Sequence, residues 1–169
     1  MVTTNCVTGR ACYLEEKKDK FRLLAIAKAS SSLPYVCPIT YVDGKPMLDG
    51  GIIDSIPVLR AMEQGYEHNV VVLTRNRGYR KSEKDIKVPR FIYTRYPRLR
   101  VVLSNRCKVY NQQLEMVERL EDEGKIIAIR PEKPVQVDRI ERDTKKLTAL
   151  YEEGYACAEK VMTSAFGSK

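Results

Sequence analysis

The 169-residue sequence has no tryptophan and a single histidine, His68, and its five cysteines form no C-x-x-C pair. A zinc site and a disulfide framework are therefore not expected, and the cysteines are predicted to be reduced thiols. The N-terminus lacks a signal-peptide profile, and no apolar run approaches the roughly 20 residues that span a bilayer. These absences predict a cytoplasmic protein that is soluble or at most peripheral to a membrane.

The sequence also lacks the G-x-S-x-G motif, which presents a catalytic serine in many hydrolases. A serine triad would need His68, which precedes a predicted strand and is interpreted as a surface histidine. Ser30, Ser31 and Ser32 end a predicted helix, and Ser55 lies at the start of another, so all four are interpreted as structural. No nucleophile, metal site or cofactor site is predicted within these residues.

The most informative segment that is present is Leu48–Pro57, with the sequence LDGGIIDSIP. Asp49 stands between an apolar approach and two glycines, Gly50 and Gly51, which let the chain turn sharply and let other backbone come close. Such a turn can present one carboxylate at the end of a strand, where it accepts a proton from a nucleophile or orients its base. From these residues alone, the alternative is a turn in which Asp49 only binds nearby amides.

Turn residues and hydrophobic periodicity predict an α/β fold. Hairpins are predicted to turn at Thr8-Gly9 and at Asp43-Gly44. The predicted strands cover residues 1–4, 10–14, 36–42, 46–48, 70–73 and 125–130. The predicted helices cover residues 19–30, 55–64, 105–123 and 143–166, the second with Asp54 or Ser55 as its N-cap. The apolar run at 70–73 is typical of a strand buried on both faces, and the strand, helix and strand over 46–73 predict a βαβ unit. A mostly parallel sheet flanked by helices is therefore expected.

Residues 75–108 hold most of the excess positive charge of the chain. Twelve basic and two acidic residues give this segment a net charge of +10, against +8 for the whole chain. It is interpreted as a solvated face, as a patch for anionic lipid or, least favoured because no nucleic-acid motif is recognised, as a nucleic-acid patch. Four aromatic residues are interleaved with these charges and can sit at a membrane interface or stack on bases: Tyr79, Phe91, Tyr93 and Tyr96. The last three can instead be core residues.

An ordered series of motifs extends on both sides of Asp49. Its members are Thr3–Gly9, Ala29–Pro34, Pro38, Asp43–Pro46, Leu48–Ile52, Ile56–Val58, Val70–Arg75 and Gly78–Lys81. The series resembles the C-terminal half of a patatin-like acyl hydrolase, in the bacterial branch of that family. The resemblance covers residues 1–81 well and the remainder more loosely.

The resemblance implies a patatin-like sheet that is incomplete at the N-terminus, over residues 1–80, and a basic, mainly helical extension with one further strand over 81–169. It also implies a serine–aspartate dyad that hydrolyses acyl esters of lipids without metal or cofactor. Only Asp49, with Gly50 and Gly51 shaping its turn, has a counterpart here. The serine elbow and the glycine-rich oxyanion loop belong N-terminal to these residues, so this chain alone is predicted to be inactive.

A second class of function remains open at this point. The chain can instead be a non-catalytic basic module that docks on anionic lipid or another acidic partner, with Asp49 purely structural. In either case an incomplete sheet exposes an edge, and we expect the chain to form a homo-oligomer through it.

Overall fold

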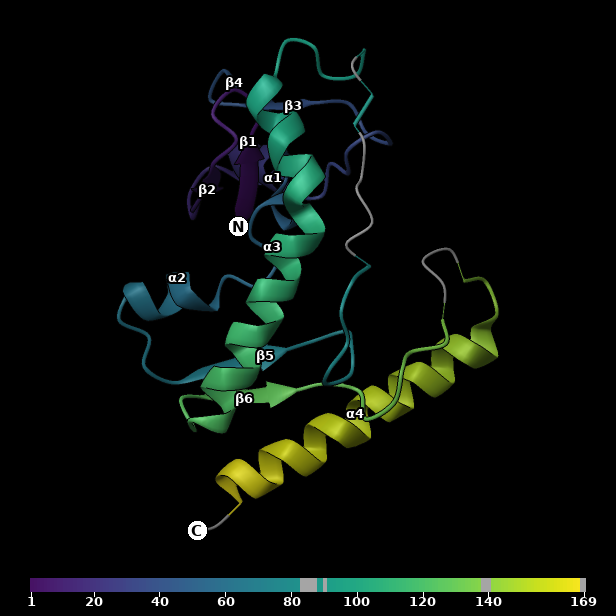
Figure 1. Ribbon diagram of the computed structural model, residues 1–169. Helices are drawn as coiled ribbons and strands as arrows, with labels where there is room; N and C mark the ends of the chain where they lie inside the picture. The colour runs from purple at the N-terminus through teal and green to yellow at the C-terminus, as the bar shows by residue number, and fades with distance from the viewer. Residues whose placement is uncertain (83–87, 90, 138–140, 168–169) are drawn as a thin grey trace. The chain divides into compact units, whose positions relative to one another are not determined.

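The structure is a computed structural model that describes residues 1–82, 88–89, 91–137 and 141–167. It is a mixed α/β fold (Figure 1), and the chain divides into two compact units. Unit 1 comprises Met1–Pro57 and Lys81–Leu114, and unit 2 comprises Val58–Arg80 and Glu115–Lys169. The predicted domain boundary near residue 80 stays a prediction.

Unit 1 contains a four-stranded sheet. Its strands are β1 (Val2–Asn5), β2 (Ala11–Tyr13), β3 (Thr40–Val42) and β4 (Lys45–Asp49), in the order β2-β1-β4-β3. Both predicted hairpins are confirmed, because β1 pairs with β2 and β3 with β4, each antiparallel. Asp43 and Gly44 have φ angles of 50° and 72°. Positive φ at both central residues is the conformation that a tight hairpin turn needs.

The prediction of a mostly parallel sheet is wrong. All three pairings in the four-stranded sheet are antiparallel, including the central one between β1 and β4, which sets Thr3 opposite Asp49. Short turns cannot join parallel neighbours, so the two hairpins fix the outer pairs as antiparallel. The predicted strand at 36–42 is also shorter than expected, since β3 begins at Thr40.

Helices cover both faces of this sheet. Helix α1 (Lys20–Ser30) begins at its predicted N-cap, Asp19, whose carboxylate accepts hydrogen bonds from two main-chain amides of the first turn. Successive residues of β4 point to opposite faces. Met47 packs with Ile26 of α1, whereas Leu48 packs with the first turns of helix α3 (Pro97–Asp122). The end of β4 is therefore anchored in two apolar clusters.

Unit 2 contains a parallel pair of strands, β5 (Asn69–Val72) and β6 (Ile126–Ile129). The predicted βαβ unit over 46–73 is wrong, because β4 and β5 belong to different sheets. The strand before α3 is β5 and the strand after it is β6, so α3 makes the crossover. The prediction that β5 is buried on both faces is also wrong, since Val70 and Val72 are 45% and 70% exposed.

The remaining helices are present as predicted, but two of them begin at other residues than expected. Helix α2 (Val58–Glu63) begins later than predicted, and α3 begins at Pro97 rather than near residue 105. Helix α4 (Thr144–Phe166) has its predicted N-cap, Asp143, which accepts a hydrogen bond from the Lys145 amide. Within the residues that the structure describes, no helix is long and apolar enough to cross a membrane.

Candidate active site

Asp49 is the last residue of β4 and is half-buried. Its main chain is held on both sides, since its amide donates to the Ser32 carbonyl at 2.9 Å and its carbonyl accepts from the Thr4 hydroxyl at 2.8 Å. Its Oδ1 accepts a hydrogen bond of 2.7 Å from the Gly51 amide. No hydrogen bond to its Oδ2 comes from the described residues, so this oxygen can accept a proton from another group.

The two glycines after Asp49 have different structural roles. The short 3-10 helix η1 (Gly50–Ile52) begins at the first of them. A Cβ added to Gly50 would lie 2.4 Å from the Val2 carbonyl oxygen, so the close approach of β1 requires glycine at this position. A Cβ on Gly51 would lie 3.1 Å from Asp49 Oδ1, against a side chain rather than backbone. Gly50 sets the close packing of the turn, and Gly51 supplies the amide that orients the carboxylate.

A second carboxylate, Asp54, follows in the same turn and is fully engaged. Its Oδ2 accepts from the Tyr13 hydroxyl at 2.7 Å, and its Oδ1 accepts from Gln113 Nε2 at 2.8 Å. The same Gln113 accepts a hydrogen bond of 3.0 Å from the Ser55 amide through Oε1. Gln113 of α3 therefore holds the segment after the Asp-Gly-Gly turn with both ends of its amide. Neither Asp54 nor Ser55 caps α2, because that helix begins only at Val58.

The serine hydroxyls discussed above are bound to main-chain carbonyls. Ser30 donates to Val2 at 2.7 Å, Ser31 to Ala27 at 2.9 Å, Ser32 to Lys28 at 2.7 Å and Ser55 to Gly51 at 2.8 Å. These contacts agree with the interpretation that all four serines are structural. His68 lies directly before β5 and is exposed, as predicted for a histidine at a strand entry.

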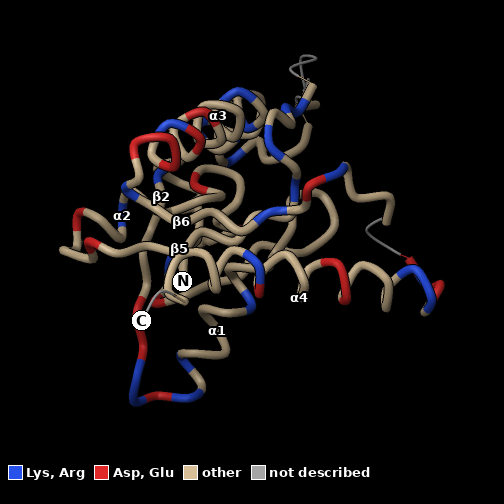
Figure 2. Tube along the Cα trace, turned by 90° about the horizontal axis from the view of Figure 1, so that it is seen from below, with Lys and Arg blue, Asp and Glu red and all other residues tan. Residues whose placement is uncertain are grey.

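Part of the basic segment is neutralised by α3. Within unit 2, Arg80 pairs with Glu118 at 2.8 Å, and Arg77 pairs with Asp122 at 2.7 Å and with Glu121 at 3.1 Å. Figure 2 shows basic and acidic residues along this helix, and the acidic ones lie in its second half. The Arg80 guanidinium beside Glu118 lowers the pKa of that carboxyl to about 2.

The aromatic residues of the basic segment divide into core and surface. Tyr93 and Tyr96 pack against the apolar cluster of Leu48 and Leu99 in unit 1, and the Tyr93 hydroxyl accepts a hydrogen bond from the Tyr35 amide. Phe91 is 81% exposed. Of the predicted interface aromatics in unit 1, only Phe91 is available to a partner. Lys84, Lys87 and Arg90 lie outside the described residues.

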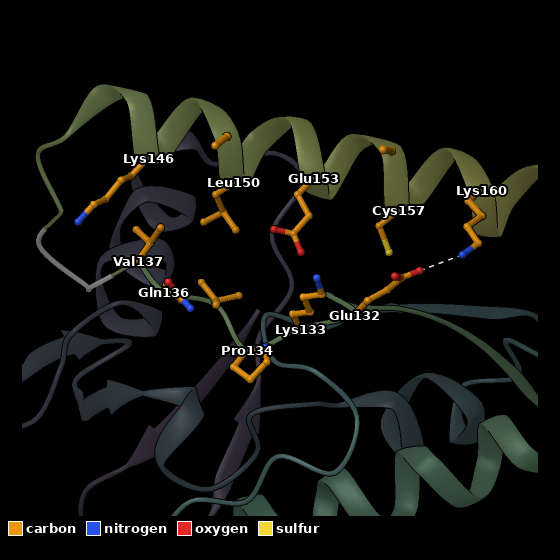
Figure 3. Close-up of a pocket in the computed structure, with 13 residues that line it drawn as sticks. Glu132, Lys133, Pro134, Gln136, Val137, Lys146, Leu150, Glu153, Cys157 and Lys160 are labelled. Atoms are coloured by element: carbon orange, nitrogen blue, oxygen red, sulfur yellow. Dashed lines mark hydrogen bonds and ion pairs between the residues drawn. The ribbon is translucent and has the colours of Figure 1, made fainter.

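Unit 2 also contains an open groove of about 680 Å³ between α4 and residues 132–137 (Figure 3). Lys160 and Glu132 form an ion pair of 2.8 Å at one end, and the Cys157 thiol donates to the Arg130 carbonyl. Figure 3 shows Glu153 pointing into the groove toward Lys133. Among the lining residues that the structure describes, no nucleophile is hydrogen-bonded to a base, so Asp49 is the better candidate for chemistry.

Comparison with known families divides the chain. Residues 10–62, which include Asp49, Gly50 and Gly51, match the family model described as Patatin-like phospholipase. Residues 96–165, which span α3, β6 and nearly all of α4, match a family model described as a domain of unknown function, DUF6363. No curated protein matches the sequence. The match at 10–62 supports a hydrolase family for the N-terminal part of the chain.

Proposed function

We propose that this chain contributes the catalytic base of a lipid acyl ester hydrolase, with Asp49 as the aspartate of a serine–aspartate dyad. The observation that carries the proposal is the geometry of Asp49 inside the patatin-matching segment. Its main chain is fixed, its Oδ1 is oriented by the Gly51 amide, and its Oδ2 receives no hydrogen bond from the described part of the chain. A carboxylate held in this way can take the proton of a serine hydroxyl without a histidine between them.

The proposed chemistry gives Asp49 two steps. As the serine oxygen attacks the ester carbonyl, its proton moves to Asp49 Oδ2, and that proton then passes to the departing alcohol. In the second half-reaction Asp49 takes a proton from water, whose oxygen attacks the acyl-serine ester. As the bond between the acyl carbon and the serine oxygen breaks, Asp49 returns the proton to that oxygen, and the acid is released. Asp54 is a poorer candidate for this role, because Tyr13 and Gln113 already occupy both of its oxygens.

The nucleophile in this proposal is a serine outside these 169 residues. The four candidate hydroxyls described above donate to main-chain carbonyls, and no G-x-S-x-G motif occurs in the sequence. On this proposal the serine elbow and the oxyanion loop, like the nucleophile, are supplied by residues outside this sequence. On this proposal the 169-residue chain alone hydrolyses no ester.

A fluorophosphonate probe, which reacts covalently with activated serines, tests the proposal. The 169-residue chain should remain unlabelled, whereas the protein translated from the reading frame extended upstream of the Met1 codon should be labelled stoichiometrically. The upstream codons should encode a glycine-rich loop followed by G-x-S-x-G. Stoichiometric labelling of the short chain, or an upstream frame without that motif, would contradict the proposal.

A second candidate function is peripheral docking on anionic lipid through the basic segment, with no catalysis. The observation that favours it is the exposed Phe91, which two exposed arginines, Arg95 and Arg98, follow in the sequence. An aromatic ring flanked by basic side chains suits the interface of an anionic bilayer. The ion pairs of Arg77 and Arg80 weigh against the whole segment acting as one cationic patch. The two candidate functions are compatible, since lipid docking would also bring an acyl hydrolase to its substrate.

A further inference from the structure

The two parallel strands β5 and β6 form a sheet of their own, which is unusual. Parallel strands occur almost only in sheets buried on both faces, and a two-stranded sheet is marginally stable in water. Here β5 has β6 on one side only. Its other side hydrogen-bonds to no main-chain group of the residues that the structure describes. The free edge of β5 is therefore a template for another strand.

The side chains of β5 also lack cover. Val70 and Val72 lie on the same face of the strand, and they are 45% and 70% exposed. Each strand has a helix neighbour, α4 for β6 and α2 for β5, but the contact with α2 leaves Val70 and Val72 largely exposed. In unit 1 the edge strands β2 and β3 have only three residues each, a length that limits pairing with another chain. Of these edges, β5 offers the longest ladder and the most apolar one.

The sequence around β5 is complementary to itself in one antiparallel register. When two copies pair with Val71 opposite Val71, the exposed Val70 of each copy faces the exposed Val72 of the other. The strand itself ends at Asn69 and Val72, and the same register brings the flanking Glu67 of one copy and Arg75 of the other to the same end of the ladder. Val–Val pairs and opposite charges are both favourable across antiparallel strands. A shift of one residue would set Val72 opposite Val71 and place the two charges out of line.

The two charged residues are available for this contact. Glu67 is exposed, and among the described residues no ion pair to it is formed. The Arg75 guanidinium lies 5.0 Å from the centre of the Tyr79 ring, a contact that leaves its nitrogens free to meet a carboxylate as well. Arg75 is therefore held near the end of β5 while it keeps its charge.

We propose that two copies of this chain form a symmetric dimer by antiparallel pairing of their β5 strands, centred on Val71. The dimer has a continuous four-stranded sheet in the order β6-β5-β5-β6, in which Val70 of each copy packs laterally against Val72 of the other. A two-fold axis through Val71 makes the interface isologous, so both Glu67–Arg75 pairs form at once.

The test is the dimer dissociation constant, measured by sedimentation equilibrium over a dilution series. The double variant Val70→Lys/Val72→Lys should raise it by about 10-fold or more, because lysines then face each other across the edge. Its matched control is Leu33→Lys/Val36→Lys, which changes two side chains of similar exposure, 45% and 78%, outside any strand. The control should leave the constant unchanged.

A charge exchange tests the register itself. Glu67→Arg and Arg75→Glu should each raise the dissociation constant by about 3-fold to 10-fold, since each places like charges opposite one another twice. The variant that carries both changes should restore the wild-type value, because its opposite charges meet again. A wild-type monomer at every concentration, a dimer that survives the two lysines, or a double charge variant without recovery would overturn the proposal.

Discussion

Gly50 and Val2 lie in such close contact that a side chain at position 50 has no space. The nearest atom to an added Cβ is the Val2 carbonyl oxygen at 2.4 Å, and this oxygen also accepts the Ser30 hydroxyl hydrogen bond. One carbonyl of β1 thus meets both the turn after Asp49 and the end of α1.

We predict that Gly50→Ala lowers the free energy of unfolding by about 1–3 kcal/mol, because β1 and the turn after β4 must move apart. Chemical denaturation measures the change. Gly154→Ala is the control, since a Cβ at that position of α4 meets nothing within 4 Å. It should leave stability unchanged or raise it by about 1 kcal/mol. Equal stability of Gly50→Ala and wild type would contradict the close approach.

A second prediction follows from the two hydrogen bonds of the Gln113 side chain, one to Asp54 and one from the Ser55 amide. Gln113→Glu keeps an acceptor for the Ser55 amide but replaces the donor to Asp54 with a second carboxylate. We expect a loss of about 1–3 kcal/mol at neutral pH, because like charges then face each other in a partly buried site. Acidification should recover part of this loss as one carboxyl takes a proton. If Gln113→Glu had the stability of wild type at every pH, the hydrogen bond between Gln113 and Asp54 would not stabilise the turn.

The Arg80–Glu118 pair makes the stability of unit 2 depend on pH. The arginine lowers the pKa of Glu118 from 4.5 to about 2. A lowered folded-state pKa stabilises the fold above pH 4.5, and this contribution is lost as the pH falls toward 2. Glu118→Gln should therefore be less stable than wild type at neutral pH, by about 1–3 kcal/mol, with the difference narrowing across that window.

Glu115→Gln is the matched control for Glu118→Gln. Glu115 is 63% exposed and lies 3.6 Å from Arg80, so its loss should change stability by less than about 1 kcal/mol. Thermal denaturation at pH values between about 2 and 7 measures both variants. A constant difference between Glu118→Gln and wild type across this range would contradict the assignment.

The lipid-docking candidate predicts preferential binding to anionic vesicles. Co-sedimentation should recover more protein with vesicles that contain phosphatidylserine than with phosphatidylcholine alone, and added salt should reduce the difference. Phe91→Ser should weaken the binding, whereas Tyr41→Ser, at another exposed aromatic residue of unit 1, should not. Equal recovery with both vesicle types would count against this function.

Local chemistry made part of the fold predictable from sequence. The Asp19 and Asp143 caps and the Asp43-Gly44 turn depend on residues next to them in the chain, and the structure has all three. The pairing of β1 with β4 joins residues more than 40 positions apart, and no local pattern indicates it. A run of valines at β5 suggested burial on both faces, but burial depends on which segments cover a strand, and Val72 is 70% exposed.

The same distinction applies to the candidate site. Asp49, Gly50 and Gly51 were predicted from their spacing and from the ordered motifs around them, because the three residues alone also fit a purely structural turn. Gln113 was missed because it binds Asp54 from 59 positions further along the chain and stands in an ordinary stretch of amphipathic helix. A contact of that kind becomes visible only when α3 is placed against the sheet.

The most direct test of the central proposal is the rate of ester hydrolysis by the upstream-extended protein carrying Asp49→Asn. Loss of the base should lower kcat by about 100-fold to 10,000-fold with little change in KM, and fluorophosphonate labelling should slow in parallel. Asp54→Asn, the matched carboxylate in the same turn, should keep most of the activity. An Asp49→Asn variant with wild-type kcat would contradict the account.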